Sequence, residues 1–452
     1  MVEPANTVRQ KPEMPSRQDY DACHQTIAPG DHYGLEFPFT MEQLSTFGAA
    51  FLTAAFRASG VLSDDNAVIT VDELNPVTIY GASERALLTV SYLRDAPGLQ
   101  TQLFIKFPSA DPDFKFMVAP MAKGEVTFQR LSCDANLPIA IPKYYFGDHC
   151  ARTTNFILIT EQIGYGQAPI EKAHRKGFDH EIAGVEAYYE LLTLSLARLV
   201  AAHKTGAIAA DIERLFPFGA AARDFDPIAD AEARVDRLIA FVSGTAKHLF
   251  IPEATDPQFL ERWRADLLFG VEHKDAVIDY LHANPDYTGL CHPNLNVDNA
   301  WFWRDEAGQL NAGLIDWGGA GQMSVAQALS SMLMMPQPEK YQQLALMIRR
   351  TFIGELGRLN GIELDADELR LQYKSSLYST AICTILTNIV DLFGMYSADE
   401  WASMKDRYDA RMLEHGMIAA IEWIENMLRE WTEPFTPGDA CREIVARRKK
   451  EL

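Results

Sequence analysis

The hydrophobic pattern changes its period along the first third of the chain. Residues 40–60 carry apolar side chains at helical spacing, whereas residues 68–107 contain short β-type runs broken by glycine and proline. Residues 117–135 return to helical spacing, and residues 155–161 (NFILITE) have the composition of a buried strand. This part of the chain is therefore predicted to form a small sheet with accompanying helices.

The rest of the chain has mainly helical spacing. A long helix is predicted over about residues 181–203, residues 222–284 are helical in pieces, and residues 325–431 are almost entirely helical. Between them, residues 287–317 have the composition of short strands and tight loops. Early strands and late helices predict an α+β fold, in which a small sheet-containing lobe precedes a large helical lobe.

Composition and charge exclude several classes of protein. The chain has 452 residues, 48% of them hydrophobic, and 41 Lys and Arg against 62 Asp and Glu, which gives a net charge of −21. So acidic a chain is a poor candidate for binding nucleic acid or an anionic membrane, because both need a basic surface. We also expect no transmembrane helix, since no apolar run approaches about 18 residues. The amino-terminal residues lack the apolar segment of a secretory signal, and the six cysteines form no CxxC pair, so we expect a cytoplasmic protein with reduced thiols.

Several common catalytic motifs are absent from the sequence. It contains no GxxxxGK[ST], HExxH or GxSxG, and no GxGxxG that follows a strand. Walker-type nucleotide triphosphatases, zinc proteases of the HExxH type, α/β-hydrolases and simple Rossmann dehydrogenases are therefore disfavoured.

A lysine interrupts one of the predicted strands. Lys106 lies within the apolar run FIKF, where a lysine is costly to bury without a partner. Glu125 follows 19 residues later and shares the apolar face of its helix with Met121 and Phe128. A carboxylate on an inward face needs a cation, so we predict an ion pair between Lys106 and Glu125. The alternative is that Lys106 reaches water at a strand edge while Glu125 lies at the rim of the apolar face.

Polar residues are concentrated in the segment LCHPNLNVDNAWFW (290–303), which GLIDWGGAG (313–321) follows closely. Asp316 would end a buried strand next to glycines, which suits a hard cation such as Mg²⁺, and Asn299 could supply a second oxygen ligand. The alternative is an ordinary Asn- and Asp-rich loop that makes local hydrogen bonds to its own backbone.

Taken in order, these features resemble the protein kinase-like fold in its aminoglycoside phosphotransferase and choline kinase branch. That family carries an HGDxxxxN loop followed by an IDW-G or IDF-G motif, and the matching stretches here are HPNLNVDN (292–299) and IDWG (315–318). The resemblance spans roughly residues 70–335. It implies a bilobal molecule with an amino-terminal arm over residues 1–38, a small antiparallel-sheet N-lobe over residues 39–163 and a large, mainly helical C-lobe over residues 164–452.

The resemblance also implies roles for the matched residues. Lys106 would hold the α- and β-phosphates of ATP while it pairs with Glu125, and the loop 78–88 would cover the nucleotide. The residues implied for the nucleotide are Gly81, Ser83, Lys106, Glu125, Glu161, Gln162 and Ile163, and those implied for Mg²⁺ are Asn299 and Asp316. The last three nucleotide residues would form the hinge beside the adenine ring.

The chain departs from the family at the position of the catalytic aspartate, which falls on Asn294. An amide cannot accept a proton at neutral pH, although its carbonyl oxygen can accept a hydrogen bond. His292 and Asp298 are candidate substitutes for the missing base. The expected function is ATP- and Mg²⁺-dependent phosphoryl transfer to a hydroxyl of a small molecule. The acceptor stays open among aminoglycosides, sugars, choline-like alcohols and hydroxyacyl thioesters, and the oligomeric state is open too.

Two other functions stay possible on the sequence. The first is a pseudokinase, a nucleotide-binding regulatory or interaction module that has lost phosphoryl transfer, as Asn294 would allow. The second is a structural helical protein whose motif matches are accidental.

Overall fold

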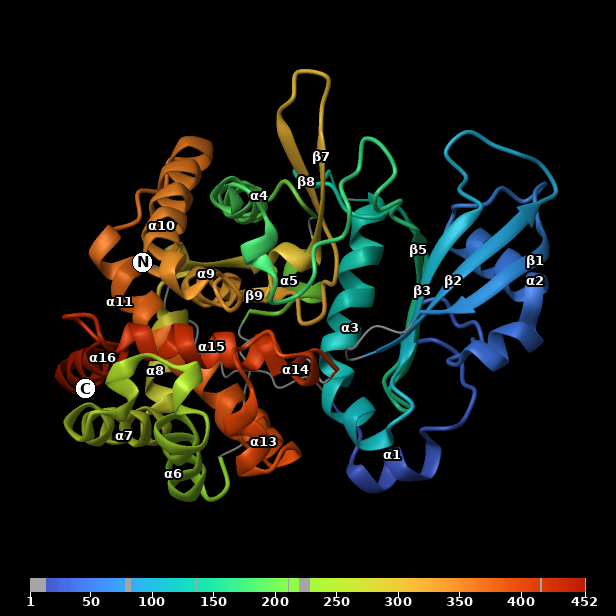
Figure 1. The fold of residues 1–452 in the computed structure, drawn as a ribbon. Coiled ribbons are helices and arrows are strands. Elements are labelled where there is room, and N and C mark those ends of the chain that lie inside the picture. The colour runs from blue at the N-terminus through green and yellow to red at the C-terminus, as the bar shows by residue number, and fades with distance from the viewer. Residues whose placement is uncertain are drawn as a thin grey trace.

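The computed structural model describes residues 14–77, 83–134, 136–209, 211–218, 228–414 and 417–451. Two lobes lie side by side, with the sheet on one side and most of the helices on the other (Figure 1). The predicted α+β class is confirmed, because a small antiparallel sheet is followed by a large, mainly helical lobe.

The small lobe contains a five-stranded antiparallel sheet with the strand order β1-β2-β3-β5-β4. Its elements are α1 (Arg17–Cys23), α2 (Met41–Ala58), β1 (Val68–Pro76), β2 (Ser83–Tyr92), β3 (Gln102–Pro108), α3 (Pro112–Asp134), β4 (Tyr144–Cys150) and β5 (Asn155–Glu161). Helix α2 packs on the outer face of the sheet, where Leu52 and Phe56 contribute to the same apolar core as Leu88 and Ile105. Helix α3 lies between the sheet and the large lobe (Figure 1).

The ends of these helices follow from local chemistry. Thr40 caps α2 by accepting a hydrogen bond from the Gln43 N–H at 3.2 Å, while the Gln43 side chain accepts one from the Phe39 N–H at 2.9 Å. Asp111 accepts the N–H groups of Asp113 and Phe114, each at 2.9 Å, at the start of α3. Helix α3 thus begins before residue 117, where the apolar pattern alone had placed its start.

The segment before residue 39, predicted to be an arm, packs against the small lobe over the part that the structure describes. Helix α1 places Tyr20 in a fully buried position, and its hydroxyl donates to the Pro112 carbonyl at 2.6 Å. Phe37 is also buried, in the core beneath α2. These residues therefore anchor the start of α3. The boundaries 1–38, 39–163 and 164–452 stay predictions.

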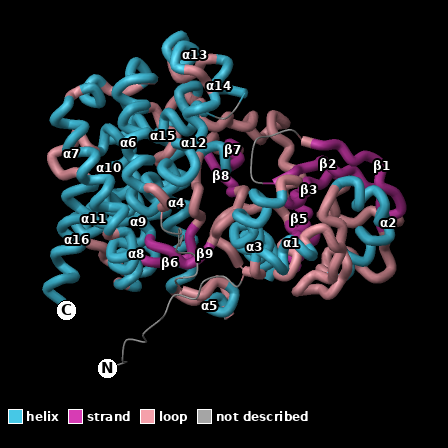
Figure 2. Tube along the Cα trace, turned by 90° about the horizontal axis from the view of Figure 1, so that it is seen from below, coloured by secondary structure: helices cyan, strands magenta, loops and turns pink. Residues whose placement is uncertain are grey.

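Helices dominate the large lobe, and Figure 2 shows them gathered away from the strands of the small lobe. Its longer helices are α4 (Val185–Lys204), α6 (Ala231–Ala240), α7 (Pro257–Glu272), α8 (Lys274–Ala283), α9 (Val325–Met332), α10 (Pro338–Asn360), α11 (Ala366–Leu377), α15 (Met417–Glu430) and α16 (Pro437–Glu451). The short helices are α5 (Ile212–Leu215), α12 (Val390–Leu392), α13 (Ala398–Ser403) and α14 (Ala410–Glu414). Two antiparallel strand pairs complete the lobe: β6 (Thr288–Cys291) with β9 (Gly321–Ser324), and β7 (Ala300–Arg304) with β8 (Leu310–Leu314).

Most predicted elements are present, with two differences besides the earlier start of α3. The long helix begins at Val185 because Gly184 precedes it in the left-handed conformation, with φ of 68°. Strand β4 was not predicted from the sequence. Within the described ranges, no helix has the length and apolar character needed to cross a membrane. A cytoplasmic location stays a prediction.

Candidate functional site

Three charged side chains from three elements meet between the lobes. Lys106 of β3 donates from Nζ to Oε1 of Glu125 on α3 at 2.6 Å, and to Oδ1 of Asp316, which follows β8, at 2.7 Å. Lys106 is 7% exposed and Glu125 is 6% exposed. The predicted ion pair is confirmed, and the alternative in which Lys106 reaches water is wrong. Lys106 also connects the small lobe to the loop after β8, a contact that sequence spacing did not predict.

The ionisation of this cluster follows from burial and charge. Lys106 holds the pKa of Asp316 well below its usual range. Burial favours the neutral amine of Lys106, but the carboxylates of Asp316 and Glu125 outweigh it and raise the pKa of Lys106. Burial raises the pKa of Glu125 against the attraction of Lys106. Asp316 therefore stays ionised to a lower pH than Glu125 does.

Helix α3 also contacts the loop that carries Asp316. The Gly319 N–H donates to the Met121 carbonyl at 3.2 Å. At Gly124 a Cβ atom would lie 3.3 Å from the Ala320 carbonyl oxygen, so glycine allows the helix and the loop to approach closely. The loop after β8 is thus fixed to the helix that bears Glu125.

Asp316 has a left-handed backbone conformation, with φ of 62°, which costs a non-glycine residue about 1–2 kcal/mol. The fully buried Trp317 secures this geometry. Its ring stacks on Phe128 of α3 with a centroid separation of 3.7 Å, and the His292 ring lies 4.6 Å away. Backbone strain of this kind is concentrated at functional sites, where surrounding contacts maintain it.

His292 holds the loop 292–299 in place. Its ring is 0% exposed, Nδ1 accepts the Asn294 N–H at 3.1 Å, and Nε2 contacts the Ile315 carbonyl at 2.9 Å. Since Nδ1 is the acceptor, the proton must be on Nε2. Both nitrogens are thereby engaged by the backbone, and the assignment of His292 as a catalytic residue stays a prediction.

We expect His292 to remain neutral down to about pH 4, because burial lowers its pKa to about 4. A histidine whose folded pKa lies below its unfolded value of about 6.5 stabilises the fold fully above pH 6.5 and loses that contribution as the pH falls towards 4. Imidazole ¹⁵N NMR should show the Nε2–H tautomer unchanged between pH 8 and 5. A titration near pH 6.5, or an Nδ1–H tautomer, would contradict this arrangement.

An amide network orients the side chains of the same loop. Asn299 donates from Nδ2 to the Asn294 carbonyl at 2.7 Å. The buried Asn296 amide is best satisfied with its nitrogen towards the carbonyl oxygens of Ser331 and Met332, at 3.3 and 3.0 Å, which turns its oxygen to the Asn294 side chain. Only the NH₂ group of Asn294 can donate to that oxygen. The carbonyl oxygen of Asn294 is then turned away from Asn296.

Asp298, the other candidate base, is partly exposed. Burial raises its pKa, Lys176 opposes that effect, and the charge of Asp316 adds to it. Asp298 therefore interacts electrostatically with Asp316, and its role as a base stays a prediction.

The predicted hinge residues lie at the end of β5 and directly after it. Glu161 accepts the Lys143 N–H at 2.8 Å through its side chain, so that side chain contributes to strand pairing. Gln162 and Ile163 are partly exposed, and within the described ranges the Ile163 N–H has no hydrogen-bond acceptor. Ser83 is the partly exposed first residue of β2, whereas Gly81 lies outside the described residues.

Three residues on the Lys106 face of the sheet were missed from the sequence. Strand β2 pairs with β3 so that Leu87 opposes Phe104 and Arg85 opposes Lys106. Directly opposed residues project from the same face of a sheet, so all three lie on the Lys106 face. The two-residue period of β3 could have identified Phe104 from Lys106. Arg85 and Leu87 required the register between the strands.

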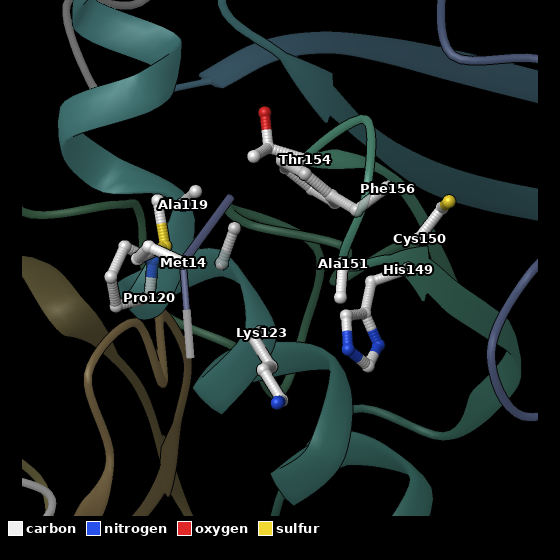
Figure 3. A pocket seen from close by; sticks show the side chains of 10 residues that line it. Met14, Ala119, Pro120, Lys123, His149, Cys150, Ala151, Thr154 and Phe156 are labelled. Atoms are coloured by element: carbon white, nitrogen blue, oxygen red, sulfur yellow. The ribbon is translucent and has the colours of Figure 1, made fainter. Parts of the chain in front are cut away.

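A small cavity lies between α3 and the β4–β5 hairpin, where Lys123 and His149 are among the lining side chains (Figure 3). None of the predicted site residues lines it. The cavity is therefore separate from the Lys106 cluster.

Comparisons with known proteins gave matches among solved structures alone. No family model matches the sequence, and no curated protein matches it. A choline/ethanolamine kinase family protein from Mesorhizobium loti is 13% identical, with 85% of this chain and 100% of that chain covered and a TM-score of 0.38. A spectinomycin phosphotransferase in complex with ADP and spectinomycin is 13% identical (83% and 94% covered, TM-score 0.42), and a Plasmodium vivax ethanolamine kinase is 14% identical (84% and 86% covered, TM-score 0.41).

Proposed function

We propose that the chain is an ATP- and Mg²⁺-dependent phosphotransferase that acts on a hydroxyl of a small molecule. The observation that carries the proposal is the contact of Lys106 with both Glu125 and Asp316. A buried lysine fixed by one carboxylate on a helix and by a second on a strained loop suits a site that positions phosphates beside a metal. The pairing of Lys106 with Glu125 is also what the sequence resemblance implies.

In the proposed site the adenine ring lies against the face of the sheet that carries Lys106. Leu87 and Phe104 supply an apolar, partly exposed surface on the Lys106 face. The Ile163 N–H would donate to a ring nitrogen of the base, and Glu161 and Gln162 would border it. Ser83, together with Gly81 of the preceding loop, would approach the phosphates, while Lys106 would hold the α- and β-phosphates.

Asn299 and Asp316 fit the ligand requirements of Mg²⁺. Both offer oxygen atoms, and the bond from Asn299 Nδ2 to the Asn294 carbonyl fixes the orientation of the Asn299 amide. Across the described residues, no group of three or more His, Cys, Asp or Glu could hold a metal ion. A single carboxylate and an amide suit Mg²⁺, which retains waters and binds phosphate oxygens. When bound, the ion would neutralise charge on the transferring phosphoryl group.

Asn294 would hold the acceptor hydroxyl through its amide oxygen. That oxygen can accept the hydroxyl hydrogen bond and orient the nucleophile, although it cannot take the proton. Phosphoryl transfer depends mainly on positioning and electrostatic stabilisation, since the transition state is loose. We therefore infer a slow phosphotransferase that relies on alignment of its substrates. The proposed acceptor is a small molecule, and we propose no binding to nucleic acid or to a membrane.

Asn294 also favours a second candidate, a pseudokinase that binds nucleotide for regulation or interaction. The two functions share the nucleotide site and differ in whether phosphate reaches an acceptor. Transfer of the ³²P-labelled γ-phosphate from ATP to members of a hydroxylated metabolite panel would favour the enzyme. Saturable nucleotide binding without transfer to any member would favour the second candidate.

Thermal melting with ATP and Mg²⁺ tests the nucleotide site that both candidates need. A ligand present at 100 times its Kd stabilises the folded state by about 2.7 kcal/mol. We expect the melting temperature to rise with MgATP, and to rise much less when EDTA removes the Mg²⁺. An unchanged melting temperature at millimolar MgATP would reject the proposed function and the second candidate together.

A further inference from the structure

Arg85 lies directly opposite Lys106 in the sheet. The register of β2 and β3 pairs the two residues, so their side chains project from the same face. Opposed residues of antiparallel strands have Cβ atoms about 4.5–5.5 Å apart. The next residue, Ala86, is 1% exposed and belongs to the core on the other face of the sheet. Arg85 itself is partly exposed, on the same face of the sheet as Lys106.

The charge of Arg85 reaches the Lys106 cluster. The positive charge of Arg85 attracts the carboxylates of both Glu125 and Asp316. Lys106 is already bonded to those same two carboxylates, so its positive charge is largely committed within the protein. A triphosphate that approaches this cluster would meet one lysine accompanied by two acidic groups. A second cation on this face would offset them.

We propose that Arg85 is a second phosphate-binding cation, which holds the nucleotide phosphates together with Lys106. The inference rests on the proposed function, because it concerns the same nucleotide. An arginine presents a planar fork of donors that matches two phosphate oxygens, which a lysine cannot do. Arg85 stands at the third position of β2, within the segment 78–88 that would cover the nucleotide. A guanidinium at that position can contact the phosphates from the sheet side.

The test is calorimetric titration of the full chain with MgATP, MgADP and adenosine, in the wild type and in Arg85→Gln. We expect the Kd for MgATP to rise roughly 10- to 100-fold in the variant, as for the loss of a charge-assisted hydrogen bond. MgADP should be affected less, and adenosine should bind with an unchanged Kd because it carries no phosphate. Arg85→Lys keeps the charge without the fork and should recover part of the affinity for MgATP.

Arg94→Gln is the matched control. Arg94 belongs to the same lobe, is exposed and forms an ion pair with Asp65. It follows the last residue of β2, whereas Arg85 lies near the first residue of that strand. The substitution removes one positive charge from the chain, as Arg85→Gln does, and should leave every Kd unchanged. Equal losses for adenosine and MgATP in Arg85→Gln would assign Arg85 a merely structural role. An unchanged Kd for MgATP would overturn the inference and leave the proposed function standing, whereas a wild type that binds no nucleotide would overturn both.

Discussion

Replacing Lys106 with methionine is expected to abolish MgATP binding and to lower the free energy of unfolding by about 3–5 kcal/mol. The loss of stability arises because Glu125, which is 6% exposed, would keep a buried carboxyl group without its cation. The Asp316 side chain is 37% exposed and can be solvated, so Glu125 dominates the cost. Urea unfolding measures the stability, and calorimetric titration measures the binding.

The double variant Lys106→Met/Glu125→Leu separates stability from function. Buried ion pairs can often be replaced by apolar side chains without loss of stability. We therefore expect the double variant to regain most of the wild-type unfolding free energy while it still fails to bind MgATP. If the single variant were as stable as the wild type, the pair would not be buried as described. If the double variant bound MgATP normally, Lys106 would have no role in the nucleotide site.

Replacing Asn294 with aspartate is expected to increase phosphoryl transfer by roughly 10²- to 10⁴-fold, the usual contribution of a positioned general base. The new carboxylate can accept the proton that the amide of Asn294 cannot. The neighbouring Asn296 can turn its amide to donate to this carboxylate, since the two side chains are already hydrogen-bonded. Single-turnover transfer from γ-labelled ATP is the measurement, with Kd for MgATP determined in parallel.

Two further variants serve as controls for the interpretation of the Asn294→Asp result. Asn294→Ala removes the hydrogen-bond acceptor and should lower the wild-type transfer rate if the amide oxygen holds the hydroxyl. Asp298→Asn tests whether the nearby carboxylate already serves as the base, in which case transfer should fall in this variant. Equal transfer rates in the wild type and in Asn294→Asp would refute the view that the amide limits the reaction. Transfer only in Asn294→Asp would identify the natural chain as a nucleotide-binding module.

The ion pair of Lys106 could be predicted because a charge in an apolar strand needs a partner, and one carboxylate lay on the inward face of the next helix. The lobe order followed equally well from the change of hydrophobic period. Strand β4 (YYFGDHC) was missed because its polar residues mask the strand pattern. In the fold, Asp148 is 0% exposed and accepts the N–H groups of His32 and Tyr33 at 3.1 and 2.8 Å. The two N–H donors that satisfy this buried carboxylate lie in a loop more than a hundred residues away, so the local sequence cannot reveal them.

The roles within the loop 292–299 also depended on contacts far apart in the sequence. His292 resembles a catalytic histidine in sequence, and only its contact with Ile315 shows that the ring is committed to the backbone. The orientation of the Asn294 amide depends on Asn296, and through it on the carbonyl groups of Ser331 and Met332. Arg85 became visible only through the register of β2 against β3. Residue type and spacing thus located the site, and tertiary contacts determined what each residue can do.

The most direct test is a crystal structure of the full chain with a non-hydrolysable ATP analogue and Mg²⁺. We predict the analogue between the lobes, with its base against Phe104 beside Ile163 and its phosphates in contact with Lys106. Mg²⁺ should be ligated by Asp316 and Asn299. A structure in which the analogue is bound away from Lys106 would contradict a nucleotide site at this cluster. So would a structure in which no analogue is bound at a saturating concentration.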